Sequence, residues 1–196
     1  FTALVSGFNV ARSVAAGLRV SGPHCNQDVA CSSGYLATHH ASGVLQTDDE
    51  CRLMLVAGVS LLLKPHSALG LYMMGVLSPS GTMRPFDTAA DGMVWGEACT
   101  ALVLTTPSPD GASHPALLGS AYTTNNAFSP AGFVASDGIA QAAAHSFRVA
   151  NIAPTQLVMI HPHGMGNPPS DIPELTGLLE VLSRESALPP VVLVGH

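Results

Sequence analysis

The chain has 196 residues, of which 47% are hydrophobic and only 10% charged, so it can bury a sizeable core and is too apolar to be disordered. Seven Lys and Arg against thirteen Asp and Glu give a net charge of -6, with no basic cluster that could follow a nucleic-acid backbone. The longest apolar run, Leu53–Leu63, is interrupted by Gly58 and Ser60 and is too short for a membrane span. These features disfavour nucleic-acid partners and membrane anchoring.

The cysteines and histidines do not form a recognisable ligand pattern. The four cysteines stand apart, without a C-x-x-C pair, at positions 25, 31, 51 and 99. His39 and His40 are adjacent, and His161 and His163 flank a proline, so neither pair has companion ligands at metal spacing. We therefore expect no metal site and a reducing compartment.

The first half of the chain alternates helical and strand-like segments. Apolar positions recur at helical spacing from Cys31 to Leu45, and Cys31 is expected in the first turn of that helix. The continuous apolar run Arg52–Ser60 predicts a strand covered on both faces, and Met93–Thr105 continues as a second apolar run. Turn residues at 107–111 then break the pattern before Ala116–Ala121 resumes as a strand. This break is the expected internal boundary.

The second half continues the alternation. The pattern predicts helices at Gly138–Ala150 and Ile172–Ser183, and strands at Leu157–His161 and Val191–Val194. Strands that alternate with helices are typical of a mostly parallel, layered sheet. The expected fold class is therefore α/β.

Three residues stand where an α/β protein often places its chemistry. Cys31 lies at a strand-to-helix junction, where a helix dipole favours a thiolate, although a lone cysteine among small residues is more often a buried apolar filler. His163 follows an apolar strand and begins a glycine-rich loop, and His196 follows V-V-L-V-G in the same way. Each histidine could equally be an ordinary residue at a strand end. A convergent Cys-His-His site is one hypothesis that this pattern allows.

Several motifs resemble the β-ketoacyl synthase (ketosynthase) domains of polyketide and fatty acid synthases. The segment G-P-H-C-N-Q-D-V-A-C-S-S-G from Gly22 resembles the family motif around its acyl-carrying cysteine, and the segment Gly75–Ala98 is similar to the long family signature almost position by position. The remaining similarities are shorter: N-V-A-R at Asn9–Arg12, L-V-A-G-V-S-L-L-L-K-P at 55–65, H-P-H-G-M-G-N around His163, Asp171 and Glu174 in a G-D-P-I-E-like segment, and Gly195-His196.

The resemblance implies an incomplete thiolase-like layered fold, α-β-α-β-α. Residues 1–106 would form the latter part of the N-terminal ketosynthase half, 107–115 a linker, and 116–196 the start of the C-terminal half. Ketosynthase domains are about twice as long as this chain, which begins without an initiator methionine, so the chain is expected to be an internal piece. A cytoplasmic or plastid location is expected.

The resemblance also implies a decarboxylative Claisen condensation. Cys31 would accept an acyl chain, His163 and His196 would stabilise the enolate of a malonyl-type extender, and Glu174 and Asp171 would support them. The substrates would arrive on the phosphopantetheine of an acyl carrier protein, with no cofactor bound directly, and the domain would form a homodimer.

The chain also departs from the family pattern. Val191 stands in place of the lysine that pairs with the glutamate at Glu174, so this carboxylate must find another partner, turn to water or take up a proton. Met165 and Asn167 replace threonines that bind the pantetheine arm, and Gly34 replaces a serine, which loosens the helix by up to roughly 1 kcal/mol.

These departures keep two further functions in consideration. One is a degenerate ketosynthase-like domain that no longer condenses and serves in dimerisation or carrier docking, a hypothesis that Val191 favours and the retained Cys31, His163 and His196 oppose. The other is an unrelated Cys-His hydrolase, which would leave the signature at Gly75–Ala98 unexplained.

Overall fold

A computed structural model describes residues 10–107, 114–124, 134–184 and 192–193 of the chain. The chain divides into two compact units, the first formed by Phe1–Ser60 with Ala98–His114 and the second by Leu61–Glu97 with Pro115–His196. Within the described ranges, every helix is too short or too polar to cross a membrane.

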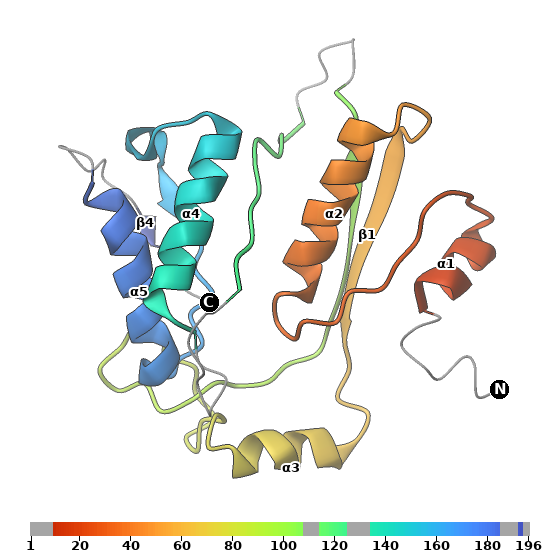
Figure 1. Cartoon of the computed structure of the whole chain (residues 1–196). Coiled ribbons are helices and arrows are strands. Elements are labelled where there is room, and N and C mark those ends of the chain that lie inside the picture. Colours follow the sequence, from red (N-terminus) through yellow and green to blue (C-terminus); the bar gives the residue numbers. More distant parts are fainter. Residues whose placement is uncertain (1–9, 108–113, 125–133, 185–191, 194–196) are drawn as a thin grey trace. The chain divides into compact units, whose positions relative to one another are not determined.

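Among its described residues, the first unit contains two helices and a two-stranded sheet (Figure 1). Its elements are α1 (Val10–Leu18), α2 (Ser33–Thr47), β1 (Leu53–Ser60) and β2 (Ala98–Thr105). β1 and β2 pair antiparallel, from Leu53 opposite Thr105 to Ser60 opposite Ala98. The predicted strand at 52–60 is confirmed, but the expectation of a mostly parallel sheet is wrong for this pair, because an apolar run carries no information about the direction of a strand.

Helix α2 covers one face of this sheet (Figure 1). Along β1 the residues Met54, Val56, Gly58 and Ser60 are the less exposed set, and Val56 is only 7% exposed. The alternate residues are exposed although most are apolar, as with Leu55 and its cross-strand partner Val103, which are 40% and 59% exposed. The prediction that both faces of this strand are covered is therefore wrong for the residues that the structure describes.

In the described part of the second unit there are three helices, a short 3-10 turn and a small parallel sheet. Its elements are α3 (Pro65–Met73), α4 (Ser136–Ala150), η3 (Pro154–Gln156), β3 (Met159–Ile160), α5 (Pro168–Leu182) and β4 (Val192–Leu193). In the parallel pair, Met159 lies opposite Val192 and Ile160 opposite Leu193. The predicted helices at 138–150 and 172–183 and the strand at 157–161 are confirmed in kind, with shifted ends. Of the strand predicted at 191–194, residues 192–193 form a strand, and 191 and 194 lie outside the described residues.

Helices α4 and α5 pack closely because a glycine lies at their contact (Figure 1). A Cβ on Gly177 would meet the carbonyl oxygen of Ser136 and the Cβ of Ile139, so no larger residue fits without a shift of backbone. Ala140, Val181 and Leu182 are buried around this contact. α4 ends at Asn151, whose left-handed backbone (φ 53°) caps the last carbonyls of the helix.

Sequence patterns miss or displace several elements. They do not predict α1 and α3, and residues 116–121, expected as a strand, form no strand. α5 begins four residues before the expected start, at Pro168, because proline is well tolerated in the first turn of a helix, where its missing N–H group is not needed. Proline therefore marks this helix start instead of a loop.

We predict that the 196-residue chain alone binds a hydrophobic dye and self-associates, because the outer face of the β1–β2 sheet is apolar and exposed. Leu55→Glu with Val103→Lys places an opposite-charge pair directly across the strands on that face and should weaken both effects. Dye fluorescence and light scattering measure the change.

The matched control is Met54→Glu with Leu104→Lys, the neighbouring cross-strand pair on the covered face. Burial of two charges there should unfold the unit, visible as loss of the circular dichroism signal. A wild-type chain that neither binds the dye nor associates would show that the exposed face is not adhesive.

Candidate active site

Cys31 lies on a tight turn directly before α2. Ala30 adopts a left-handed backbone (φ 53°), which is strained for a residue with a Cβ. Ser33 holds the turn closed: its hydroxyl accepts a hydrogen bond from Val29 N at 2.9 Å and donates one to the Ala30 carbonyl oxygen at 2.7 Å. Cys31 itself is exposed. The helix starts at Ser33, with Ser32 as its N-cap, so the expectation that Cys31 belongs to the first helical turn is wrong by two residues. Cys31 instead belongs to the strained turn that precedes the cap.

The signature segment, Gly75–Ala98, belongs to the second unit up to Glu97 and folds back on itself there. Leu77 and Met93 form a bridge, with Ser78 N donating to the Met93 carbonyl oxygen at 2.9 Å and Met93 N donating to the Val76 carbonyl oxygen at 2.8 Å. Gly92 (φ 138°) makes this close approach possible, because a Cβ there would lie 2.5 Å from the carbonyl carbon of Leu77. The glycine is thus a steric requirement of the fold.

Asp91 ties the two arms of the signature segment together. Its carboxylate accepts a hydrogen bond from the Ser78 hydroxyl at 2.6 Å and lies 3.9 Å from the Arg84 guanidinium, which also donates to Ser80 Oγ at 3.2 Å. The Ser78 hydroxyl, then the Ser80 hydroxyl and more weakly the Arg84 charge, lower the pKa of the Asp91 carboxyl below its usual value. The two hydroxyls and the guanidinium therefore stabilise the charged form of Asp91.

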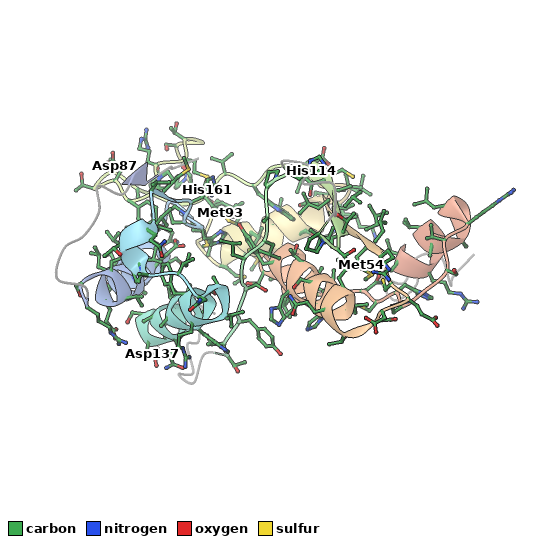
Figure 2. All side chains as sticks on the ribbon, turned by 90° about the horizontal axis from the view of Figure 1, so that it is seen from above. Met54, Asp87, Met93, His114, Asp137 and His161 are labelled. Atoms are coloured by element: carbon green, nitrogen blue, oxygen red, sulfur yellow. The ribbon has the colours of Figure 1, made fainter. Side chains whose placement is uncertain are left out.

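The signature segment contacts the histidine loop, residues 161–167. Gly92 N donates a hydrogen bond to the carbonyl oxygen of Gly166 at 2.8 Å. Figure 2 labels Met93, the residue after Gly92, and His161, the first residue of the histidine loop. Segments separated by about seventy residues of sequence thus share one backbone hydrogen bond.

Two glycines let the histidine loop lie against the signature segment. Gly164 (φ 55°) faces the rings of Pro85 and Phe86, where an added Cβ would approach to 3.0 and 3.1 Å. Gly166 (φ 70°) lies so close to the Gly92 carbonyl oxygen that a Cβ would come within 2.9 Å. Both glycines satisfy a backbone requirement and a space requirement at the same time.

Glu174 binds the backbone on which His163 is carried. Its Oε1 accepts a hydrogen bond from His163 N at 2.6 Å, and its Oε2 accepts one from Gly164 N at 2.9 Å. These bonds supply the alternative partner that this carboxylate requires when Val191 replaces the family lysine. Glu174 therefore sets the position of the His163 backbone directly.

Asp171 joins α5 to the signature segment. Only 3% of this residue is exposed, and its Oδ2 accepts a hydrogen bond from Phe86 N at 2.9 Å. Its Oδ1 has no hydrogen-bond partner among the described residues. Asn167, which precedes the same helix, and Ser170 in its first turn are also buried. The Asn167 carbonyl oxygen accepts hydrogen bonds from the N–H groups of Ser170 and Asp171, both at 2.9 Å.

The candidate residues divide between the two units. Cys31 belongs to the first unit, whereas His163, the half-buried Met165 and the supporting acids belong to the second. His196 and Val191 lie outside the described residues. In the part of the chain that the structure describes, no three His, Cys, Asp or Glu side chains are arranged to hold a metal ion.

Sequence reasoning recognised the signature segment as a motif but missed what its residues do. It does not identify Asp91 as the residue whose hydrogen bond to Ser78 joins the two arms of the segment. It also does not identify Pro85 and Phe86 as the residues against which Gly164 packs. The D-G pair at Asp91-Gly92 was the available signal, because such pairs mark sharp turns held by a side chain.

We predict that Glu174→Ala lowers the free energy of unfolding by about 1 to 3 kcal/mol, because two backbone N–H groups lose a charged acceptor. Glu174→Gln keeps one acceptor oxygen and should lose roughly half as much. Glu180→Ala is the matched control, since Glu180 is exposed and pairs with Arg184 at the surface, where an ion pair contributes little. Urea denaturation measures all three, and equal stability of Glu174→Ala and Glu180→Ala would contradict the role of Glu174.

Comparison with curated proteins finds polyketide synthases. The chain is 38% identical over 181 residues to polyketide synthase ThaG of Burkholderia thailandensis, covering 89% of this chain and 3% of that protein. It is 34% identical over 176 residues to the mycocerosic acid synthase-like polyketide synthase of Mycolicibacterium smegmatis, covering 88% of this chain and 8% of that protein. The chain therefore spans a small part of the relatives that it matches.

Solved structures and a family model agree with these relatives. The ketosynthase from module 6 of the bacillaene synthase of Bacillus subtilis 168 superposes with a TM-score of 0.84 at 27% identity, over 93% of this chain and 34% of that chain. The fold is thus part of a thiolase-like ketosynthase. The family model for the β-ketoacyl synthase N-terminal domain matches residues 6–109. The chain belongs to the β-ketoacyl synthase family.

Proposed function

We propose that this chain is part of a β-ketoacyl-[acyl-carrier-protein] synthase that extends a polyketide or fatty acyl chain by decarboxylative Claisen condensation. The observation that carries the proposal is the exposed Cys31 on its strained turn, directly before a helix, in a chain of this family. A helix N-terminus favours a negatively charged sulfur, which is the form that attacks a thioester.

The proposed reaction has two stages, transfer of the acyl group to Cys31 and condensation with the extender. The Cys31 sulfur attacks the acyl thioester of a carrier protein, forms a new thioester and releases the phosphopantetheine thiol. The malonyl-type extender then loses CO₂, and its enolate carbon attacks the carbonyl carbon on Cys31. The new C–C bond forms, the C–S bond breaks, and Cys31 leaves as a thiolate that can take up the next acyl group.

His163 and His196 are proposed to donate hydrogen bonds to the enolate oxygen as its charge develops. The register of the parallel strands supports this pairing of roles: Ile160 lies opposite Leu193, and each histidine follows its strand residue by three positions. Parallel strands end at the same edge of a sheet, which is where ligands bind in α/β folds. Glu174 would act through the backbone of His163.

Substrates are proposed to arrive on the phosphopantetheine of an acyl carrier protein, without a directly bound cofactor. Met165 lies half-buried in the histidine loop between Gly164 and Gly166, and Asn167 caps the start of α5 two residues later. These two residues are the proposed neighbours of the pantetheine arm. The proposal includes a homodimer formed through the ketosynthase domain.

One observation favours a second function, a domain that no longer condenses and serves as a dimerisation or carrier-docking scaffold. Val191 removes the cation expected beside Glu174. The two backbone N–H groups bound to Glu174 weaken this alternative, because the carboxylate has partners without the lysine. Acyl loading and decarboxylation, measured separately, distinguish the two functions.

We predict that an acyl thioester labels Cys31 and no other cysteine in a protein that carries the complete ketosynthase domain around this chain. Exposure alone cannot direct the label, because Cys25 and Cys99 are exposed as well, whereas the strained turn before α2 is found at Cys31. Peptide mass spectrometry locates the adduct. The control Cys25→Ala should leave labelling unchanged, and an adduct on Cys25 or Cys99 would refute the assignment.

We predict that His163→Ala and His196→Ala each spare acyl loading of Cys31 but slow malonyl decarboxylation by roughly 100-fold or more, the usual effect of losing one preorganised donor. Release of labelled CO₂ from a malonyl carrier measures the second step separately from loading. His66→Ala, an exposed change in α3, is the control. Wild-type protein that loads Cys31 but releases no CO₂ would favour the scaffold.

A further inference from the structure

The segment that leads to Cys31 is bound to helix α2 by a side-chain hydrogen bond that the proposed reaction does not use. Every residue from Ser21 to Ser32 is exposed except Gln27. The Gln27 side chain therefore extends from an otherwise solvent-facing stretch toward the body of the first unit. Such a stretch is free to move unless specific bonds hold it.

Gln27 makes its main contact with helix α2. Its Nε2 lies 2.8 Å from Nδ1 of His40, a half-buried residue about two helical turns beyond the start of α2. The same nitrogen donates to the sulfur of Cys25 at 3.5 Å. Since an amide nitrogen has two hydrogens, both can be used at once. The ring of His39 lies 5.8 Å from that of His40.

This contact acts on a turn that needs support. The left-handed Ala30 costs about 1 kcal/mol or more, and such a conformation persists only where its surroundings hold it. Ser33 fixes the turn locally, at Val29 and Ala30. Upstream, side chains of the segment bond to the rest of the unit through Gln27 with His40 and through Asn26 with the N–H of Ala11 at 3.0 Å. Of these two bonds, the one to His40 reaches the helix that follows Cys31.

We propose that Gln27 and His40 are positioning residues for Cys31: their hydrogen bond holds the segment before the strained turn against α2 and so sets the direction in which the cysteine is presented. The proposal rests on the proposed function only in taking Cys31 as the nucleophile. Both residues act on Cys31 through the backbone of the segment that precedes it.

The test measures the rate of Cys31 alkylation by iodoacetamide, read by mass spectrometry of the Cys31 peptide, in a protein that carries the complete ketosynthase domain. Gln27→Val and His40→Leu should each change this rate about fivefold, the equivalent of one net hydrogen bond. The alkylation rate of the double variant should differ from that of wild type by about fivefold, because both residues belong to the same hydrogen bond. Two independent effects would multiply to about twenty-five-fold. His40→Asn keeps an acceptor near the Nδ1 position and should stay within about twofold of wild type.

Matched controls make the same chemical changes elsewhere. Gln46→Val, at the exposed end of α2, and His66→Leu, in α3, should leave the rate unchanged. Variants that lower the thermal midpoint of unfolding but alkylate Cys31 at the wild-type rate would overturn the proposal and leave the bond a purely structural one. Equal changes at Cys25, Cys31 and Cys99 would overturn it as well.

The readout also separates this proposal from the proposed function. Alkylation needs neither a carrier protein nor condensation. A protein whose Cys31 alkylation depends on Gln27 and His40, but which accepts no acyl group, would support the positioning role and refute the condensing function. Loading of Cys31 at a rate that none of these variants changes would do the reverse.

Discussion

The hydrogen bond from Gly92 to Gly166 is the contact on which the second unit depends. It joins the signature segment to the histidine loop across a long stretch of sequence, and it exists only because both partners are glycines at positive φ. A side chain at either position would meet backbone atoms. Once the two segments are joined, Asp171 can bind Phe86 N, and Gly164 can lie against the Phe86 ring.

Carboxylates bound to backbone N–H groups recur around this contact. Glu174 accepts hydrogen bonds from the backbone N–H groups of His163 and Gly164. Asp171 accepts one from the backbone N–H group of Phe86. A backbone donor cannot change rotamer, so a carboxylate bound to it fixes the main chain, whereas a bond to a lysine would fix only a flexible side chain. This explains how the histidine loop keeps a defined shape in a chain where valine stands at position 191.

Sequence periodicity predicted the elements that depend on local pattern and failed where distant partners decide. The helices around Ala140 and Val181 follow from apolar spacing, and both are present. The direction of β2 relative to β1 does not follow from the sequence, because apolar residues such as Leu102 and Val103 are equally suited to a parallel and to an antiparallel strand. Motif resemblance identifies Glu174 but not its hydrogen-bond donors. Those donors are backbone N–H groups, which every residue except proline has, so no residue type marks them in the sequence. The bond between Gln27 and His40 was missed for a similar reason: residues thirteen apart form no recognised pattern.

Backbone strain lies at two places that the proposed condensing function would use. Four described residues other than glycine have positive φ, and Asn151, one of them, simply caps a helix. Two of the others are Ala30, next to Cys31, and Phe86, which supports the histidine loop. Each such conformation costs about 1 to 3 kcal/mol and persists only where neighbouring bonds enforce it. The proposed condensing function gives the strained Ala30 a use, because the turn that it forms presents the exposed Cys31 directly before the start of α2.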